Sequence, residues 1–109
     1  MTGIVGRVAA VAWLVTAAVP LAAAGDVPDA EMLAIARRHC VMCHARKPSH
    51  PSFDAPPKNV ALETIDELKA WAAKMREQVV LDRNMPVGGE TGMTEEERER
   101  LARWVEELK

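Results

Sequence analysis

The sequence predicts an all-α fold of about three main helices, with no substantial sheet. Two stretches carry apolar residues at spacings of three and four, the period at which one face of an amphipathic helix repeats. Each of these stretches opens with a T-x-x-E pattern, which is the signature of a helix capping box. No stretch alternates apolar and polar residues over the length of a strand.

The first helix is expected to follow Pro28, with Asp29 as its N-cap, and to run to about Cys40. Its apolar side consists of Met32, Leu33, Ile35 and Ala36. The next segment, residues 45–62, contains Pro48, Pro51, Pro56 and Pro57. Because proline cannot continue a regular helix, we expect this segment to be a stiff loop.

The second helix is predicted to begin with the capping box of Thr64 and Glu67. The stripe that it buries consists of Ile65, Leu68, Ala72, Met75 and Val79, with Trp71 at its border. The segment should end at Asn84-Met85-Pro86, because Pro86 disfavours helical geometry at the residue before it.

The third helix is predicted to begin with a second capping box, formed by Thr94 and Glu97. Its acidic first turn suits the positive end of the helix dipole. The stripe that it buries consists of Leu101, Trp104, Val105 and Leu108.

The N-terminal residues have the pattern of an export signal. Arg7 precedes a 12-residue apolar run over 8–19, and small residues at 22–24 allow a cut before Gly25. The sequence therefore predicts a secretory signal peptide over 1–24. The alternative is an uncleaved membrane anchor, although a spanning helix usually needs about 20 apolar residues.

The remaining residues, 25–109, form one predicted domain with a formal charge of −3. Nucleic-acid binding would require a basic face, so this balance excludes that class of partner. A domain of 85 residues buries a modest core, and such small scaffolds commonly need a staple. Only Phe53, Trp71 and Trp104 are aromatic in this domain, so a covalently fixed haem would add apolar bulk.

The residues Cys40-Val41-Met42-Cys43-His44 form a C-x-x-C-H motif, which is the attachment site of a c-type haem. Each thiol would bond to one haem vinyl group, and His44 would supply an imidazole ligand to the iron. The chain has no other cysteine that could compete for either thiol. Two alternatives are a chance occurrence of the motif and a dithiol of the thioredoxin type. The latter should lie in a βαβ setting, which this sequence does not show.

The order of these features resembles a class I cytochrome c, whose small fold wraps helices around one covalent haem. The residues are most similar to the C-terminal cytochrome c domain of bacterial membrane-bound urate oxidase (urate hydroxylase). This similarity rests on Pro51-x-Phe53-x-Ala55-Pro56 with Val60 and Leu62, on Met85-Pro86-x-Gly88, and on Thr91-Gly92-Met93-Thr94-x-Glu96-Glu97-Arg98 with Trp104.

The sequence departs from that family in two ways. Asn59 and Gly89 stand where Gly and Asn are expected, and both residue types tolerate a positive φ. The multi-span membrane part, which would carry the urate chemistry, has no counterpart in these residues. The resemblance therefore implies only the electron-transfer module.

Met85 is the expected second axial ligand of the iron. It lies 41 residues after His44, far enough for the chain to reach the opposite haem face, and the resemblance places the thioether ligand at this Met-Pro. The other candidates are Met93, His39, His50, Met32, Met42 and Met75. Of these, we expect Met42 and Met75 to fill the core and His50 to be solvated. A proline carbonyl of the 45–62 loop is expected to orient the His44 ring.

These observations predict a periplasmic, monomeric electron carrier with one haem c bound through Cys40 and Cys43, rather than an enzyme with catalytic residues. The expected partners are redox proteins such as a membrane oxidase or dehydrogenase, including a urate-oxidase-like enzyme. Partners would dock around Ala45, Val87 and Gly88. The alternative is a five-coordinate haem enzyme or gas-binding haem protein of the peroxidase type.

Overall fold

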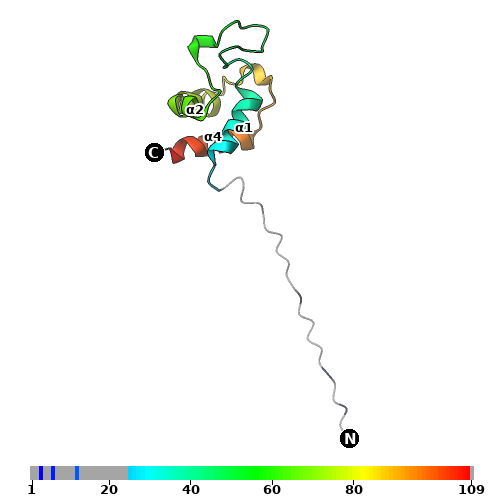
Figure 1. Cartoon of the computed structure of the whole chain (residues 1–109). Coiled ribbons are helices and arrows are strands. Elements are labelled where there is room, and N and C mark those ends of the chain that lie inside the picture. The colour runs from blue at the N-terminus through cyan, green and yellow to red at the C-terminus, as the bar shows by residue number, and fades with distance from the viewer. Residues whose placement is uncertain (1–2, 4–5, 7–11, 13–24, 109) are drawn as a thin grey trace.

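The computed structural model describes residues 25–108, together with the isolated residues 3, 6 and 12. The predicted signal peptide over 1–24 thus lies outside the continuous described part. In that part the chain is helical and has no strand, which confirms the all-α prediction. The α-helices are α1 (Asp29–His39), α2 (Ile65–Ala70), α3 (Ala72–Met75) and α4 (Glu95–Glu107) (Figure 1). None of the helices described is long and apolar enough to cross a membrane.

Both predicted capping boxes are present. In each, the threonine hydroxyl accepts from the N–H of the glutamate three residues later, and that glutamate accepts from the threonine N–H. Thr64 and Glu67 thereby begin α2, and Thr94 and Glu97 begin α4. The predicted cap of α1 was wrong, because Pro28 occupies the N-cap position. The Asp29 carboxylate instead accepts a hydrogen bond from Trp104 Nε1 at 2.9 Å.

The predicted second helix is divided into three pieces. Trp71, with φ −100° and ψ 8°, separates α2 from α3. After α3 the chain continues as the π-helical segment η3 (Arg76–Leu81). The N–H of Asp82 closes η3 by donating to the carbonyl of Glu77, five residues earlier, at 2.8 Å. The helical segment therefore ends before Met85, and Met85 lies in a loop.

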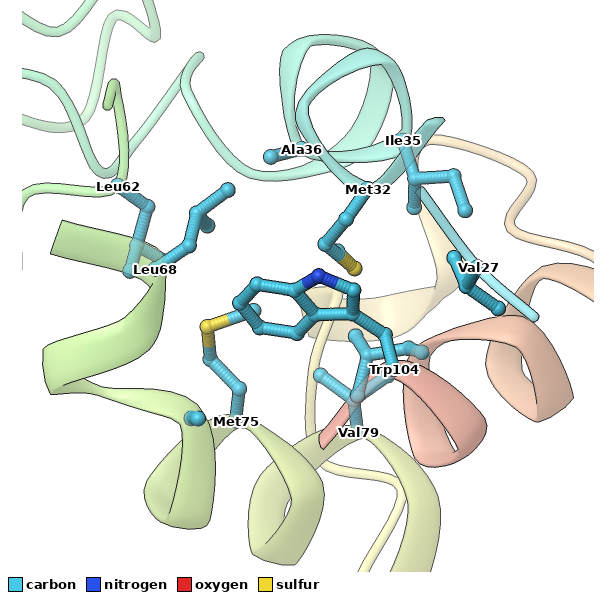
Figure 2. Close-up of a cluster of buried hydrophobic side chains, with 11 residues drawn as sticks. Val27, Met32, Ile35, Ala36, Leu62, Leu68, Met75, Val79 and Trp104 are labelled. Carbon is cyan, nitrogen blue, oxygen red and sulfur yellow. The ribbon is translucent and has the colours of Figure 1, made fainter. Parts of the chain in front are cut away.

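The core lies between α1, α4 and the segments α2, α3 and η3. Trp104 is 1% exposed, and the side chains of Met32 and Met75 both point toward its indole ring (Figure 2). Sulfur–aromatic contacts of this kind are favourable and tolerate irregular packing. The buried apolar cluster consists of Val27, Met32, Ile35, Ala36, Leu62, Leu68, Ala72, Met75, Val79, Leu101 and Trp104. Leu108 was expected in this stripe but is 37% exposed, and it lies just beyond the end of α4.

Two loops complete the domain. The first, residues 45–62, is a loop as predicted. It projects from the helices and contains a short 3-10 turn, η2 (Pro57–Asn59) (Figure 1). The second, which we call the distal loop, covers residues 82–93 and contains the 3-10 turn η4 (Val87–Gly89). Asn59 has φ +60° and Gly89 has φ +65°, so both residues adopt the backbone region for which their types are suited.

Candidate functional site

The C-x-x-C-H motif forms a tight turn directly after α1. The Cys40 N–H donates to the Ala36 carbonyl at 2.8 Å and so continues the hydrogen bonding of the helix. The Cys40 carbonyl then accepts from the N–H groups of Cys43 at 3.2 Å and His44 at 2.8 Å. Both cysteines are free and half-buried. The turn thus holds the two thiols and the imidazole within one compact unit.

The thiols of this turn are not of the activated kind. Burial raises the pKa of Cys40 to about 12, with a further contribution from Cys43. Burial and the nearby Glu90 carboxylate also raise the pKa of Cys43. Thiol–disulfide oxidoreductases need a cysteine whose pKa is lowered, so that a thiolate forms near neutral pH. The environment of both sulfurs therefore disfavours the dithiol alternative.

The ring of His44 is oriented by the backbone of the 45–62 loop. Its Nδ1 lies 2.9 Å from the carbonyl oxygen of Val60. A carbonyl can only accept, so Nδ1 carries the proton and the neutral ring keeps the lone pair on Nε2. The prediction of a proline carbonyl was wrong, because the loop presents the oxygen of Val60 instead. The Leu62 N–H also donates to the His44 carbonyl at 2.7 Å, which ties the motif to the end of this loop.

Met85 is held in the distal loop by its backbone. Its N–H donates to the carbonyl of Gln78 at 3.1 Å, and its carbonyl accepts from Arg98 Nη1 at 2.9 Å. Its side chain is half-buried against the core cluster, as are Cys40 and Val60. The structure therefore brings the motif, the loop that orients His44 and the predicted thioether to the same core.

The other methionines occupy different environments. Met93 is half-buried against the same cluster, so burial alone does not distinguish it from Met85. Met32 is fully buried beside Trp104, and Met75 is 6% exposed, which confirms the prediction that Met75 fills the core. Met42 was expected to do the same, but it is only half-buried.

His39 is buried and uses both ring nitrogens. Nδ1 lies 2.8 Å from Thr91 Oγ1, and Nε2 lies 2.8 Å from Glu97 Oε2. Because both nitrogens are engaged, His39 has no free nitrogen to offer a metal. Burial raises the pKa of Glu97, but hydrogen bonds from the Thr94 backbone, Arg38 and His39 outweigh it and lower the pKa to about 2. This network joins α1, the distal loop and α4 immediately beside Cys40.

His50 also has a partner, contrary to the expectation that it is solvated. Its Nε2 lies 3.0 Å from Glu90 Oε1, and its side chain is 15% exposed. The contact joins the 45–62 loop to the distal loop. Of the residues expected at a docking rim, Val87 is 62% exposed, whereas Ala45 is 8% exposed and does not belong to the surface.

The chemistry of these donors fits a covalent haem. Two free thiols have the required spacing, and an imidazole nitrogen with a fixed lone pair follows them. A thioether lies on the same core. Among the described residues, no group of three or more His, Cys, Asp or Glu side chains could hold a metal ion.

A cavity of about 300 Å³ lies between α1 and α4 and is separate from the predicted haem residues. It is lined by Glu31, Ile35, Arg38, Glu96, Glu97 and Arg100.

Comparison of the chain with protein-family models, curated proteins and solved structures found no match.

The sequence did not predict the supporting roles of three groups at the site. The Val60 carbonyl carries no signal, because every residue has a carbonyl. Arg98 and His39 lie in charged stretches where a solvated side chain is the usual expectation. A signal for Arg98 was its place directly after the capping box of Thr94 and Glu97, where a long side chain can reach the preceding loop.

Proposed function

We propose that this chain is an exported monohaem c-type cytochrome of the class I type, which carries single electrons between redox proteins. One observation supports this proposal above the others. Within the C-x-x-C-H turn, His44 donates through Nδ1 to the Val60 carbonyl, so the free lone pair is on Nε2. A metal-bound imidazole usually donates such a hydrogen bond from the N–H of its other ring nitrogen.

Each residue of the site then has a distinct role. Cys40 and Cys43 hold the haem covalently through thioether bonds. His44 would supply one ligand to the iron, and the Val60 carbonyl fixes its tautomer and strengthens it as a donor. Met85 is the second ligand. When bound, the haem supplies an iron that changes oxidation state by one electron, and thioether ligation raises its potential relative to a second imidazole.

The carrier would work in the periplasm, between partners such as a membrane oxidase or dehydrogenase. A urate-oxidase-like membrane enzyme is one such partner, suggested by the resemblance of the distal loop and α4. The exposed Val87 gives the distal loop an apolar contact point. Weak redox encounters bury little area, so a small rim of this kind is sufficient for docking.

The first experiment is expression of the full chain in a bacterium that attaches haem to exported proteins. Intact mass and a pyridine haemochrome assay should show one covalent haem per chain and loss of residues 1–24. Cys43→Ser is the matched control and should lack the doubly attached haem. A wild-type mass equal to the polypeptide alone would refute the proposal and favour the dithiol reading.

The same sample separates a carrier from a haem enzyme. A carrier should be low-spin and six-coordinate in both oxidation states, with no turnover of peroxide. Resonance Raman or paramagnetic resonance measures the resting spin state, and peroxide consumption measures turnover. A high-spin resting iron together with catalytic consumption of peroxide would contradict the carrier function and support the peroxidase-like alternative.

A further inference from the structure

Arg98 is a half-buried arginine that binds the loop carrying Met85. Its side chain is 12% exposed, although it lies in the charged first half of α4. One nitrogen, Nη1, donates to the carbonyl of Val79 at 2.6 Å and to the carbonyl of Met85 at 2.9 Å. A single guanidinium nitrogen thus joins the end of η3 to the distal loop.

These two hydrogen bonds satisfy carbonyls that the local backbone leaves open. Val79 lies in the last turn of a helical segment, where carbonyls lack helical partners. Met85 lies outside any helix, and its N–H is already paired with Gln78. Hydrogen bonds from a charged donor are roughly twice as strong as those between neutral groups. The backbone of Met85 is therefore held on both sides, which limits where its side chain can go.

The backbone of Arg98 is itself held by the first turn of α4. Its N–H donates to the Thr94 carbonyl at 3.0 Å, within the capped first turn of α4. One residue earlier, Glu97 binds His39, the residue that precedes Cys40. A continuous series of contacts therefore runs from the C-x-x-C-H turn through α4 to Met85. The segments that carry the two predicted iron ligands are linked through Arg98.

We propose that Arg98 is the positioning residue of Met85. It holds the Met85 backbone so that the thioether stays on the iron and resists competing ligands. This inference rests on the proposed function, because it assumes that Met85 is the second ligand. Loss of the two hydrogen bonds should therefore weaken the iron–sulfur bond more than it lowers the stability of the fold.

The test compares Arg98→Gln and Arg98→Lys with Arg103→Gln in the haem-loaded protein. Arg103 lies on the same helix, is 45% exposed and pairs only loosely with Glu107 at 3.7 Å, so it controls for the loss of an α4 charge. Imidazole is the competing ligand, and its affinity is measured by the loss of the long-wavelength Met–Fe(III) absorption band. Hydrogen exchange across residues 79–86 reports the loop directly, and circular dichroism in urea reports the fold.

For Arg98→Gln we expect imidazole affinity to rise about tenfold, equivalent to about 1.4 kcal/mol, with faster exchange over residues 79–86. Arg98→Lys should fall between this variant and the wild type, and Arg103→Gln should match the wild type. An unchanged imidazole affinity with only a lower urea midpoint would overturn the inference, as would equal changes at Arg98 and Arg103. A wild-type protein with haem but without the band would instead refute Met85 as ligand, and one without haem would refute the proposed function.

Discussion

Replacement of Glu97 by Gln tests the network that joins α1 to α4. Glu97 Oε1 accepts from the backbone N–H of Thr94, and Oε2 accepts from Arg38 at 3.0 Å and His39 at 2.8 Å. Glutamine also suits the last position of a capping box, so the start of α4 should survive. The substitution therefore removes the charge and the bond to Arg38 while it keeps the helix cap.

The magnitude follows from the pKa of the carboxyl group. The folded state lowers this pKa from its ordinary 4.5 to about 2. At 1.36 kcal/mol per pKa unit, this corresponds to an upper limit of roughly 3 kcal/mol. The side chain is 17% exposed and its partner Arg38 is 57% exposed, so solvent screening reduces the contribution. We expect Glu97→Gln to lower the free energy of unfolding by about 1–2 kcal/mol at neutral pH.

The pH dependence gives the sharper measurement. A carboxyl group with a depressed folded pKa stabilises the protein fully above its unfolded pKa of 4.5. That contribution is lost as the pH falls from 4.5 through about 2, because the wild-type group becomes protonated as well. Urea unfolding of the haem-loaded protein, followed by circular dichroism, should therefore show a difference between wild type and Glu97→Gln that shrinks across this window.

Glu96→Gln is the matched control, because Glu96 lies in the same turn of α4 and is exposed. It should change the free energy of unfolding by less than about 0.5 kcal/mol. If Glu97→Gln and Glu96→Gln behaved alike, the network would contribute nothing specific. A wild-type-to-variant difference that stayed constant down to about pH 2 would show that the charge of Glu97 is not its source.

Four further substitutions test the remaining parts of the site. Met85→Ala should open the sixth position of the proposed haem iron, lower its potential and admit carbon monoxide or cyanide, whereas Met93→Ala should change little. If the Met–Fe(III) band survived in Met85→Ala and vanished in Met93→Ala, Met93 would be the ligand instead of Met85. Cys40→Ala should leave the protein poorly folded, because the proposed haem would form part of its small core. Near-native helical content and protease resistance without haem would contradict this. Trp104→Phe removes the 2.9 Å hydrogen bond to Asp29 and part of a buried ring. It should lower the free energy of unfolding by about 1–3 kcal/mol, and an unchanged urea midpoint would argue against a structural role for this bond.

The sequence alone determined the helical fold class and the two best-defined helix starts. Each capping box, at Thr64 and at Thr94, involves residues only three positions apart, so the local sequence is enough to specify it. The C-x-x-C-H motif is equally local, and it points to haem attachment without knowledge of the fold. The break at Trp71 and the π-helical end of the second segment were not predicted, because the apolar period of three and four continues through both.

Only the tertiary structure decided which distant groups support the site. Val60 orients His44 through a backbone carbonyl, a group that every residue possesses and no side-chain pattern reveals. His39 is buried and Arg98 is half-buried because α4, α1 and the distal loop meet at them. A charged or titratable side chain is usually solvated, and it is buried only where partners from elsewhere in the chain complete its hydrogen bonds. The packing of the helices determines which partners come into contact, so the sequence around each residue does not specify them.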